Sequence, residues 1–149
     1  MAGLFESLPE RSNGPTVDAG WFNAIRTLLM QIFGGGAIRE TTFTFSNNTG
    51  PANVTGLSFD KTLYRSAIVK FCVRRKTDTA SSEVRTVHTL TCLYNTQADA
   101  WSVQDEAAGD DDGITFSITS AGQVQYTSSD ITGSNGVHNG RFKAETFNA

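Results

Sequence analysis

Short segments in which apolar and polar residues alternate recur from residue 37 to the end of the chain, and this pattern constrains the fold more than any other feature. In residues 38–45, for example, Thr42 and Thr44 alternate with Phe43 and Phe45. A period of two is typical of a strand with one face in a core. Eight strands are predicted in this way, at residues 38–45, 53–59, 67–75, 84–95, 100–105, 114–118, 123–127 and 141–147.

The stretches between the predicted strands are rich in Gly, Asn, Asp and Ser, which favour tight turns. They cover residues 47–51, 77–82, 109–113, 121–122 and 133–140. No helical pattern alternates with the strands, so a doubly wound parallel sheet is not expected. The sequence therefore predicts a mainly β fold, an antiparallel β-sandwich of jelly-roll type with about eight strands. Its expected core residues are Phe43, Phe45, Leu57, Phe59, Val69, Phe71, Val73, Leu93, Phe116, Ile118, Val124 and Phe142.

One amphipathic helix is predicted before the strands, at residues 19–33. Asp18 can cap its first turn, because a carboxylate accepts hydrogen bonds from the free backbone N–H groups there. Three glycines at residues 34–36 end the helix and supply a hinge. The helix is expected to attach or oligomerise through its apolar residues, which are Trp21, Phe22, Ile25, Leu28, Leu29 and Ile32.

This helix is too short to be stable alone, so its apolar face needs a partner. Phe22, Ile25, Leu29 and Ile32 are spaced by three and four residues, as in the seam of a coiled coil. Packing on copies of itself, on another protein or on its own sheet all satisfy the pattern. The glycines favour the first two, because they decouple the helix from the strands.

Residues 1–17 are polar and irregular, and they predict an extended arm. Its apolar residues Leu4, Phe5 and Leu8 would gain by docking on a partner or by folding back on the chain's own domain. The sequence therefore predicts two parts. Residues 1–36 form an arm, helix and hinge for attachment and oligomerisation, and residues 37–149 form a β-sandwich for display.

Charge and hydropathy argue against several partners. The net charge is −3, and the one basic run is Arg74–Lys76, which we interpret as a solvated strand end. Nucleic acid is not expected as a partner, because phosphate contacts need clustered cations. No apolar run is long enough to cross a bilayer, and no signal peptide is recognised. We therefore expect synthesis in a cytoplasm and no membrane insertion.

A search for catalytic and metal-binding patterns finds little. His88 and His138 are the only histidines, and neither has a metal-ligand spacing. The acidic run Asp110–Asp112 is interpreted as a solvated turn, with calcium binding as the alternative, although consecutive Asp residues do not match an EF-hand loop. No nucleophile elbow or phosphate-binding loop occurs. The prediction is a protein without enzymatic activity, metal or cofactor.

The two cysteines, Cys72 and Cys92, are expected to stay reduced. Alternation places Cys72 on the face of Lys70 and Arg74, whereas Cys92 shares a face with Leu90. Sulfurs on opposite faces cannot pair.

Several segments resemble a module of tailed-bacteriophage virion proteins. They are residues 43–59, 109–119, 122–128 and 140–146, so the resemblance covers roughly residues 37–147. Residues 9–33, including residues 17–26, look like the attachment segment that often precedes this module.

The resemblance implies a β-domain displayed on a phage particle as a fibre, appendage or decoration protein, made in the bacterial host cytoplasm and located in the virion. The expected partners are the chain itself, as a trimer, and other virion proteins of the tail, neck or capsid. The alternative is a carbohydrate- or receptor-binding tip of a phage fibre, which would contact a host-surface glycan. In that case Trp101 or Tyr64 could stack on a sugar ring, although the favoured interpretation of Trp101 is a core or half-buried aromatic.

Overall fold

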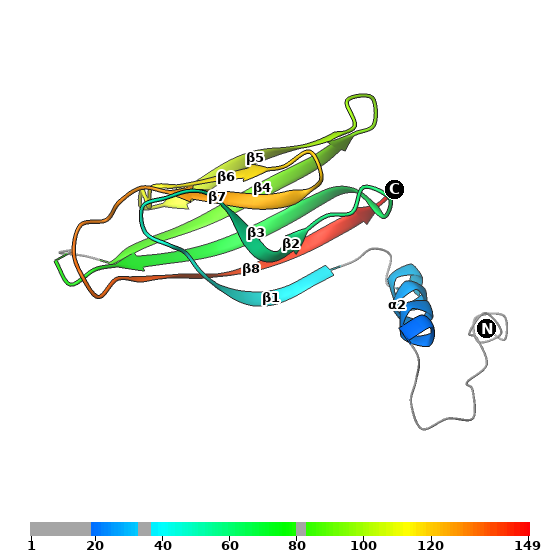
Figure 1. Ribbon diagram of the computed structural model, residues 1–149, viewed down its shortest axis with the longest axis horizontal. Helices are drawn as coiled ribbons and strands as arrows, with labels where there is room; N and C mark the ends of the chain where they lie inside the picture. Colours follow the sequence, from blue (N-terminus) through cyan, green and yellow to red (C-terminus); the bar gives the residue numbers. More distant parts are fainter. Residues whose placement is uncertain (1–18, 33–36, 80–82) are drawn as a thin grey trace, which may run out of the picture. The chain divides into compact units, whose positions relative to one another are not determined.

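The computed structural model describes residues 19–32, 37–79 and 83–149, which divide into two compact units, Met1–Gly36 and Ala37–Ala149. The first contains the helix α2, Ala19–Ile32 (Figure 1). The second contains the strands β1 (Ala37–Thr44), β2 (Thr49–Ser58), β3 (Tyr64–Lys76), β4 (Val84–Asn95), β5 (Ala100–Gly109), β6 (Ile114–Ile118), β7 (Gln123–Ser128) and β8 (Val137–Asn148). Within the described ranges, no helix is long and apolar enough to span a membrane.

The strands form two antiparallel sheets, which confirms the predicted β-sandwich. The larger sheet has the order β1-β8-β3-β4-β5 and the smaller one the order β2-β7-β6. Figure 1 shows the smaller sheet lying over the larger one. The clearest predicted hairpin is present as β6 and β7, in which Phe116 pairs with Tyr126.

Three predicted turns are partly strand, and in one of them only Gly109, the last residue of β5, belongs to a strand. β2 begins at Thr49 and therefore includes Pro51, which is tolerated because β2 is an edge strand and needs no N–H on its open side. β8 begins at Val137 and includes Gly140. A Cβ on Gly140 would lie 2.9 Å from the Phe45 ring, so the absence of a side chain allows that ring to pack over the strand.

Aromatic side chains from both sheets fill the core. Phe71 of β3 stacks on Phe116 of β6 with ring centroids 4.5 Å apart, and Phe142 of β8 lies 5.1 Å from Phe71. The described buried apolar side chains all lie between Phe45 and Ala144, so the sandwich supplies its own core. The prediction that Leu93 lies in the core is wrong. Leu93 is 53% exposed, because it faces away from the side of β4 that buries Leu90 and Cys92.

The two cysteines face opposite sides of their sheet, as predicted. Cys72 is exposed and Cys92 is buried. Burial raises the pKa of the Cys92 thiol to about 12, since the thiolate would lose its hydration.

We therefore expect one reactive thiol in the folded protein. Alkylation under native conditions should add one group, at Cys72, and alkylation after unfolding should add two. Intact mass spectrometry without reductant checks both counts. A species that is two mass units light and takes up no reagent would contradict the assigned faces.

Candidate functional site

The first candidate site is the apolar surface of α2. Phe22 is 61% exposed and Leu29 is 46% exposed, whereas Trp21 and Ile25 are half-buried. The Trp21 and Phe22 rings meet edge to face at 5.9 Å. Leu28 and Ile32 belong to the helix, but their side chains lie outside the described part of the structure, as do residues Leu4, Phe5 and Leu8 of the arm.

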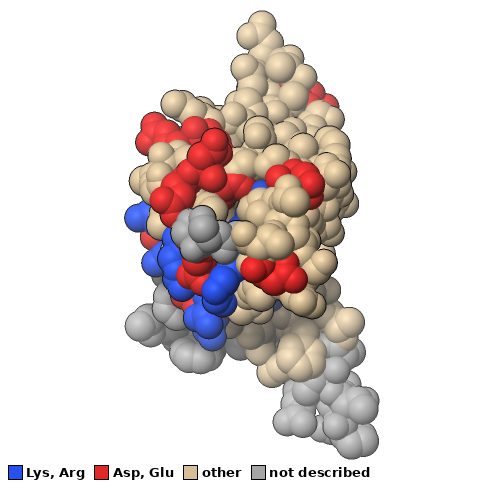
Figure 2. Space-filling model, turned by 90° about the vertical axis from the view of Figure 1, so that its left-hand side faces the viewer, with Lys and Arg blue, Asp and Glu red and all other residues tan. Residues whose placement is uncertain are grey.

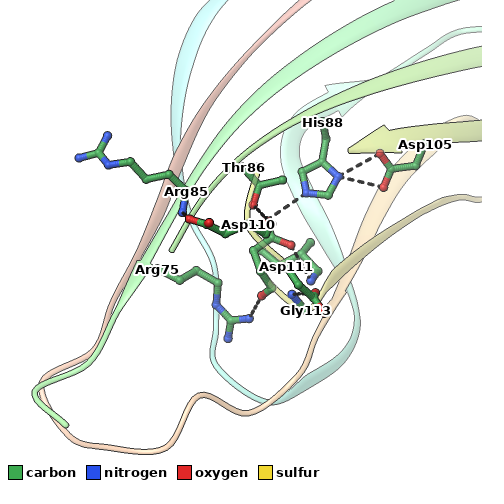
Figure 3. Close-up of polar contacts among 10 residues, drawn as sticks. Arg75, Arg85, Thr86, His88, Asp105, Asp110, Asp111 and Gly113 are labelled. Atoms are coloured by element: carbon green, nitrogen blue, oxygen red, sulfur yellow. Dashed lines mark hydrogen bonds and ion pairs between the residues drawn. The ribbon is translucent and has the colours of Figure 1, made fainter. Parts of the chain in front are cut away.

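The second candidate is a buried polar network inside the sandwich, centred on His88 of β4 (Figure 3). Its Nδ1 lies 2.9 Å from an oxygen of Asp105, and its Nε2 lies 3.0 Å from Oδ2 of Asp112. His88 and Asp112 are almost wholly buried, and Asp105 is partly exposed. Each ring nitrogen thus meets a carboxylate, an arrangement that suits an imidazolium donating two hydrogen bonds.

The protonation of this network follows from two opposing effects. Burial alone would lower the pKa of His88, but the hydrogen bonds and charges of Asp112 and Asp105 outweigh it and raise the pKa above its ordinary value. For Asp112, burial would raise the pKa, but hydrogen bonds from His88 and from the backbone N–H of Ile114 hold it below the usual range. At pH values between these two pKa values, the folded protein therefore favours a charged His88 beside a charged Asp112.

A guanidinium occupies the centre of a neighbouring buried network. Arg75 is 0% exposed and donates from Nη2 to Asn47 Oδ1 at 2.7 Å and to the carbonyl oxygen of Ser129 at 2.8 Å. Its Nη1 donates to the carbonyl oxygen of Asp112, which links it to the His88 network. Arg75 Nε lies 3.4 Å from Nδ1 of His138. The interpretation of residues 74–76 as a solvated strand end is therefore wrong for Arg75, which lies on the inner face of β3.

The acidic run is held by local backbone geometry. Gly109 and Gly113 have positive φ angles of 125° and 63°, and they reverse the chain on either side of the three carboxylates. Asp110 accepts a hydrogen bond from the backbone N–H of Arg85 at 2.9 Å, and Asp111 accepts one from Gly113 at 3.0 Å. The predicted solvated turn is correct for these two residues and wrong for Asp112, which is 4% exposed.

The chemistry available to this network is structural. Both nitrogens of His88 are bonded to carboxylates of the same chain, so neither is directed at a hydroxyl or thiol as a general base would be. In the described part of the chain, no three His, Cys, Asp or Glu side chains are placed to hold a metal ion. The alternation that places Val73 in the core extends to Arg75. This alternation was the one signal in the sequence that Arg75 is buried.

The two aromatic residues considered for sugar stacking are both inside the sandwich. Trp101 is 5% exposed and Tyr64 is 9% exposed. The Trp101 ring lies 5.7 Å from Phe59 and 5.5 Å from Tyr94, and neither of its faces is open to a ligand. The interpretation of Trp101 as a core aromatic is therefore confirmed, and sugar stacking by these two buried residues is wrong.

Comparisons with known proteins give one structural similarity. No protein-family model matches the sequence, and no curated protein matches it. The crystal structure of the tailspike protein of Acinetobacter phage vB_ApiP_P1 is similar to this chain with a TM-score of 0.45 and 16% identity. The match covers 95% of this chain and 23% of the tailspike chain, so the present chain spans about a quarter of that protein's length. A similarity at this level supports no conclusion about activity or partners.

Proposed function

We propose that the chain is a structural protein of a bacteriophage virion, which docks on the particle through residues 1–36 and displays its β-sandwich outward. The observation that carries the proposal is the exposure of Phe22 (61%) and Leu29 (46%) on α2. The sandwich, in contrast, has a core of its own. Large apolar side chains on one helix gain free energy when a partner covers them. The resemblance of residues 17–26 and 43–146 to virion proteins supplies the class of partner.

Self-association accounts for the seam of α2. Phe22 and Leu29 are separated by seven residues, the heptad repeat of a coiled coil. Three copies packed through this face would cover both side chains, and a trimer could also present many copies of the sandwich at one site on the particle. The docked assembly belongs to the tail, the neck or the head.

We expect the full chain to sediment as a trimer and residues 37–149 to sediment as a folded monomer. The double variant Phe22→Ser/Leu29→Ser should also be monomeric, because it removes the exposed apolar surface. Arg26→Ser is the matched control, since Arg26 is an exposed residue of the same helix, and it should stay trimeric. Analytical ultracentrifugation measures all four species. Monomers throughout would contradict self-association.

The docking role has its own experiment. Residues 37–149 should melt cooperatively by circular dichroism and should fail to co-sediment with particles that lack the native protein, whereas the full chain should bind them. A truncated chain that folds and still binds would move the docking surface to the sandwich. A truncated chain without a cooperative melt would show that α2 completes the core.

Receptor binding is the second candidate function. A polar cavity of about 550 Å³ lies among the β2–β3, β4–β5 and β6–β7 loops, and loop clusters of this kind commonly present ligand sites. Lys61 and Asp99 form an ion pair at its edge, and Thr62 donates to Asp60. Binding of the full chain to a glycan array, lost on Asp60→Ala, would favour this function.

A further inference from the structure

The outer face of the larger sheet gathers three arginines that lie far apart in the sequence. Strand register places Thr42, Arg141 and Cys72 in one row across β1, β8 and β3. The next row contains Thr44, Asn139, Arg74 and Arg85, across β1, β8, β3 and β4. Adjacent strands are about 5 Å apart, so side chains in these two rows are close neighbours.

These two rows line a groove. Its volume is about 480 Å³, and the three arginines, the two threonines, Asn139 and Cys72 contribute to its walls. The side chains of Arg74, Arg85 and Arg141 are 41%, 70% and 66% exposed. Their charged groups are therefore accessible from solvent, and the volume is that of a small-ligand site.

The carboxylates beside the groove do not saturate these arginines. Glu83 is shared: it accepts from Nε of Arg74 at 2.6 Å and from Nε of Arg85. Within the described residues, the terminal Nη groups of both arginines have no hydrogen-bond partner. Arg141 Nη1 bonds Glu40 at 2.8 Å. Three guanidinium groups thus bond to two carboxylates, which leaves unused donors, and the carboxylate of Asp110 is bonded to the backbone N–H of Arg85. Figure 2 shows Lys and Arg side chains gathered on this side of the molecule, with acidic side chains among them and a larger acidic group above.

We propose that this groove binds a carboxylate or phosphate group of a ligand. The planar forks of the arginines match two oxygens of either group, and hydrogen bonds to a charged group are stronger than neutral ones. Thr42, Thr44 and Asn139 add hydroxyl and amide partners for the atoms that carry the anion. The proposal concerns the sandwich alone and stands or falls separately from docking through residues 1–36.

Cys72 provides a reporter inside the groove. It is exposed, whereas Cys92 is buried and protected. Iodoacetate carries a carboxylate and iodoacetamide is its neutral analogue, so the ratio of their reaction rates at Cys72 measures attraction of an anion into the groove. A change in thiolate population affects both reagents alike and cancels in the ratio.

The experiment measures this ratio on the full chain at low ionic strength. Arg85→Gln and Arg141→Gln should each lower the iodoacetate-to-iodoacetamide ratio by about two- to fivefold, the effect of one exposed charge interaction. Arg65→Gln is the matched control: it removes the same charge from β3 but at the other end, where the guanidinium lies over the Tyr94 ring. Its ratio should equal that of the unmodified protein. Equal ratios in all four proteins would overturn the proposal.

A second arm identifies the group that binds. Inorganic phosphate, acetate and glucuronate, at matched ionic strength, should slow the reaction of iodoacetamide with Cys72 in a saturable way, and glucose should not. Stronger protection by phosphate identifies a phosphate ligand, and stronger protection by glucuronate than by acetate identifies a sugar-borne carboxylate. Protection by glucose equal to that by glucuronate, or no protection by any anion, would contradict an anion site.

Discussion

Replacing Arg75 with methionine is expected to lower the free energy of unfolding by about 2–6 kcal/mol, because two buried carbonyl oxygens lose their donor. Methionine fills much of the same space but donates no hydrogen bond. The carbonyl oxygens of Ser129 and Asp112 would lose their donor. Asn47 Oδ1 would keep only the backbone N–H of Ile131. Each buried acceptor left without a partner costs about 1–3 kcal/mol.

Arg74→Met is the matched control for this change. Arg74 is the preceding residue, points to the outer face, and shares Glu83 with Arg85. Its replacement should change stability by no more than about 0.5 kcal/mol. Urea denaturation followed by tryptophan fluorescence measures both variants. Similar unfolding midpoints for the two would show that the network around Arg75 contributes no net stability.

The sandwich was predictable because its strands repeat one simple pattern. In β3, the side chains of Val69, Phe71 and Val73 alternate with exposed ones, and a period of two in apolar residues is direct evidence for a strand with one buried face. Turn residues then separated the strands well enough to give their number and order. The pairing order β1-β8-β3-β4-β5 did not follow from the sequence, since it depends on contacts between distant segments.

The buried polar network was missed because residue type was given more weight than position. Arg75 continues the inner face of β3, and His88 lies between Thr86 and Leu90 on the inner face of β4. Charged residues are almost never fully buried without partners, and the partners of Arg75 come from three loops that the sequence could not bring together. Asp112 gave no signal, because its position depends on the turn formed by Gly109 and Gly113.

The two surface sites also differ in how far the sequence could predict them. The spacing of Phe22 and Leu29 predicted an apolar helix face, and both side chains are exposed in the structure. The arginine groove needed strand register, because Arg74, Arg85 and Arg141 are brought together only by the pairing of β3 with β4 and β8. Local periodicity identifies a face of one element, whereas a site built across strands requires the fold.

His88→Gln is expected to destabilise the protein by about 3–5 kcal/mol near pH 5.5, and by less near pH 8.5. The change leaves the buried carboxylate of Asp112 without its cation. The pKa of His88 is raised in the fold, so its contribution to stability is complete below the unfolded value of about 6.5 and is lost as pH rises through the folded value. The pKa of Asp112 is lowered, so its contribution is present above about 4 and is lost as pH falls. Together they stabilise the unmodified protein most between about pH 4 and 6.5.

His138→Gln is the control, because folding shifts the pKa of His138 in the opposite direction to that of His88. Burial, with the charge of Arg75, lowers the pKa of His138, so its contribution is present above about 6.5 and is lost as pH falls. His138→Gln should therefore destabilise the protein more at pH 8.5 than at pH 5.5, which is the reverse of the effect of His88→Gln. Urea unfolding of the three proteins at about pH 5.5 and 8.5 measures the difference. Equal destabilisation by His88→Gln at both pH values would mean that folding does not shift the pKa of His88, and a larger effect at pH 8.5 would mean that His88 is neutral in the fold.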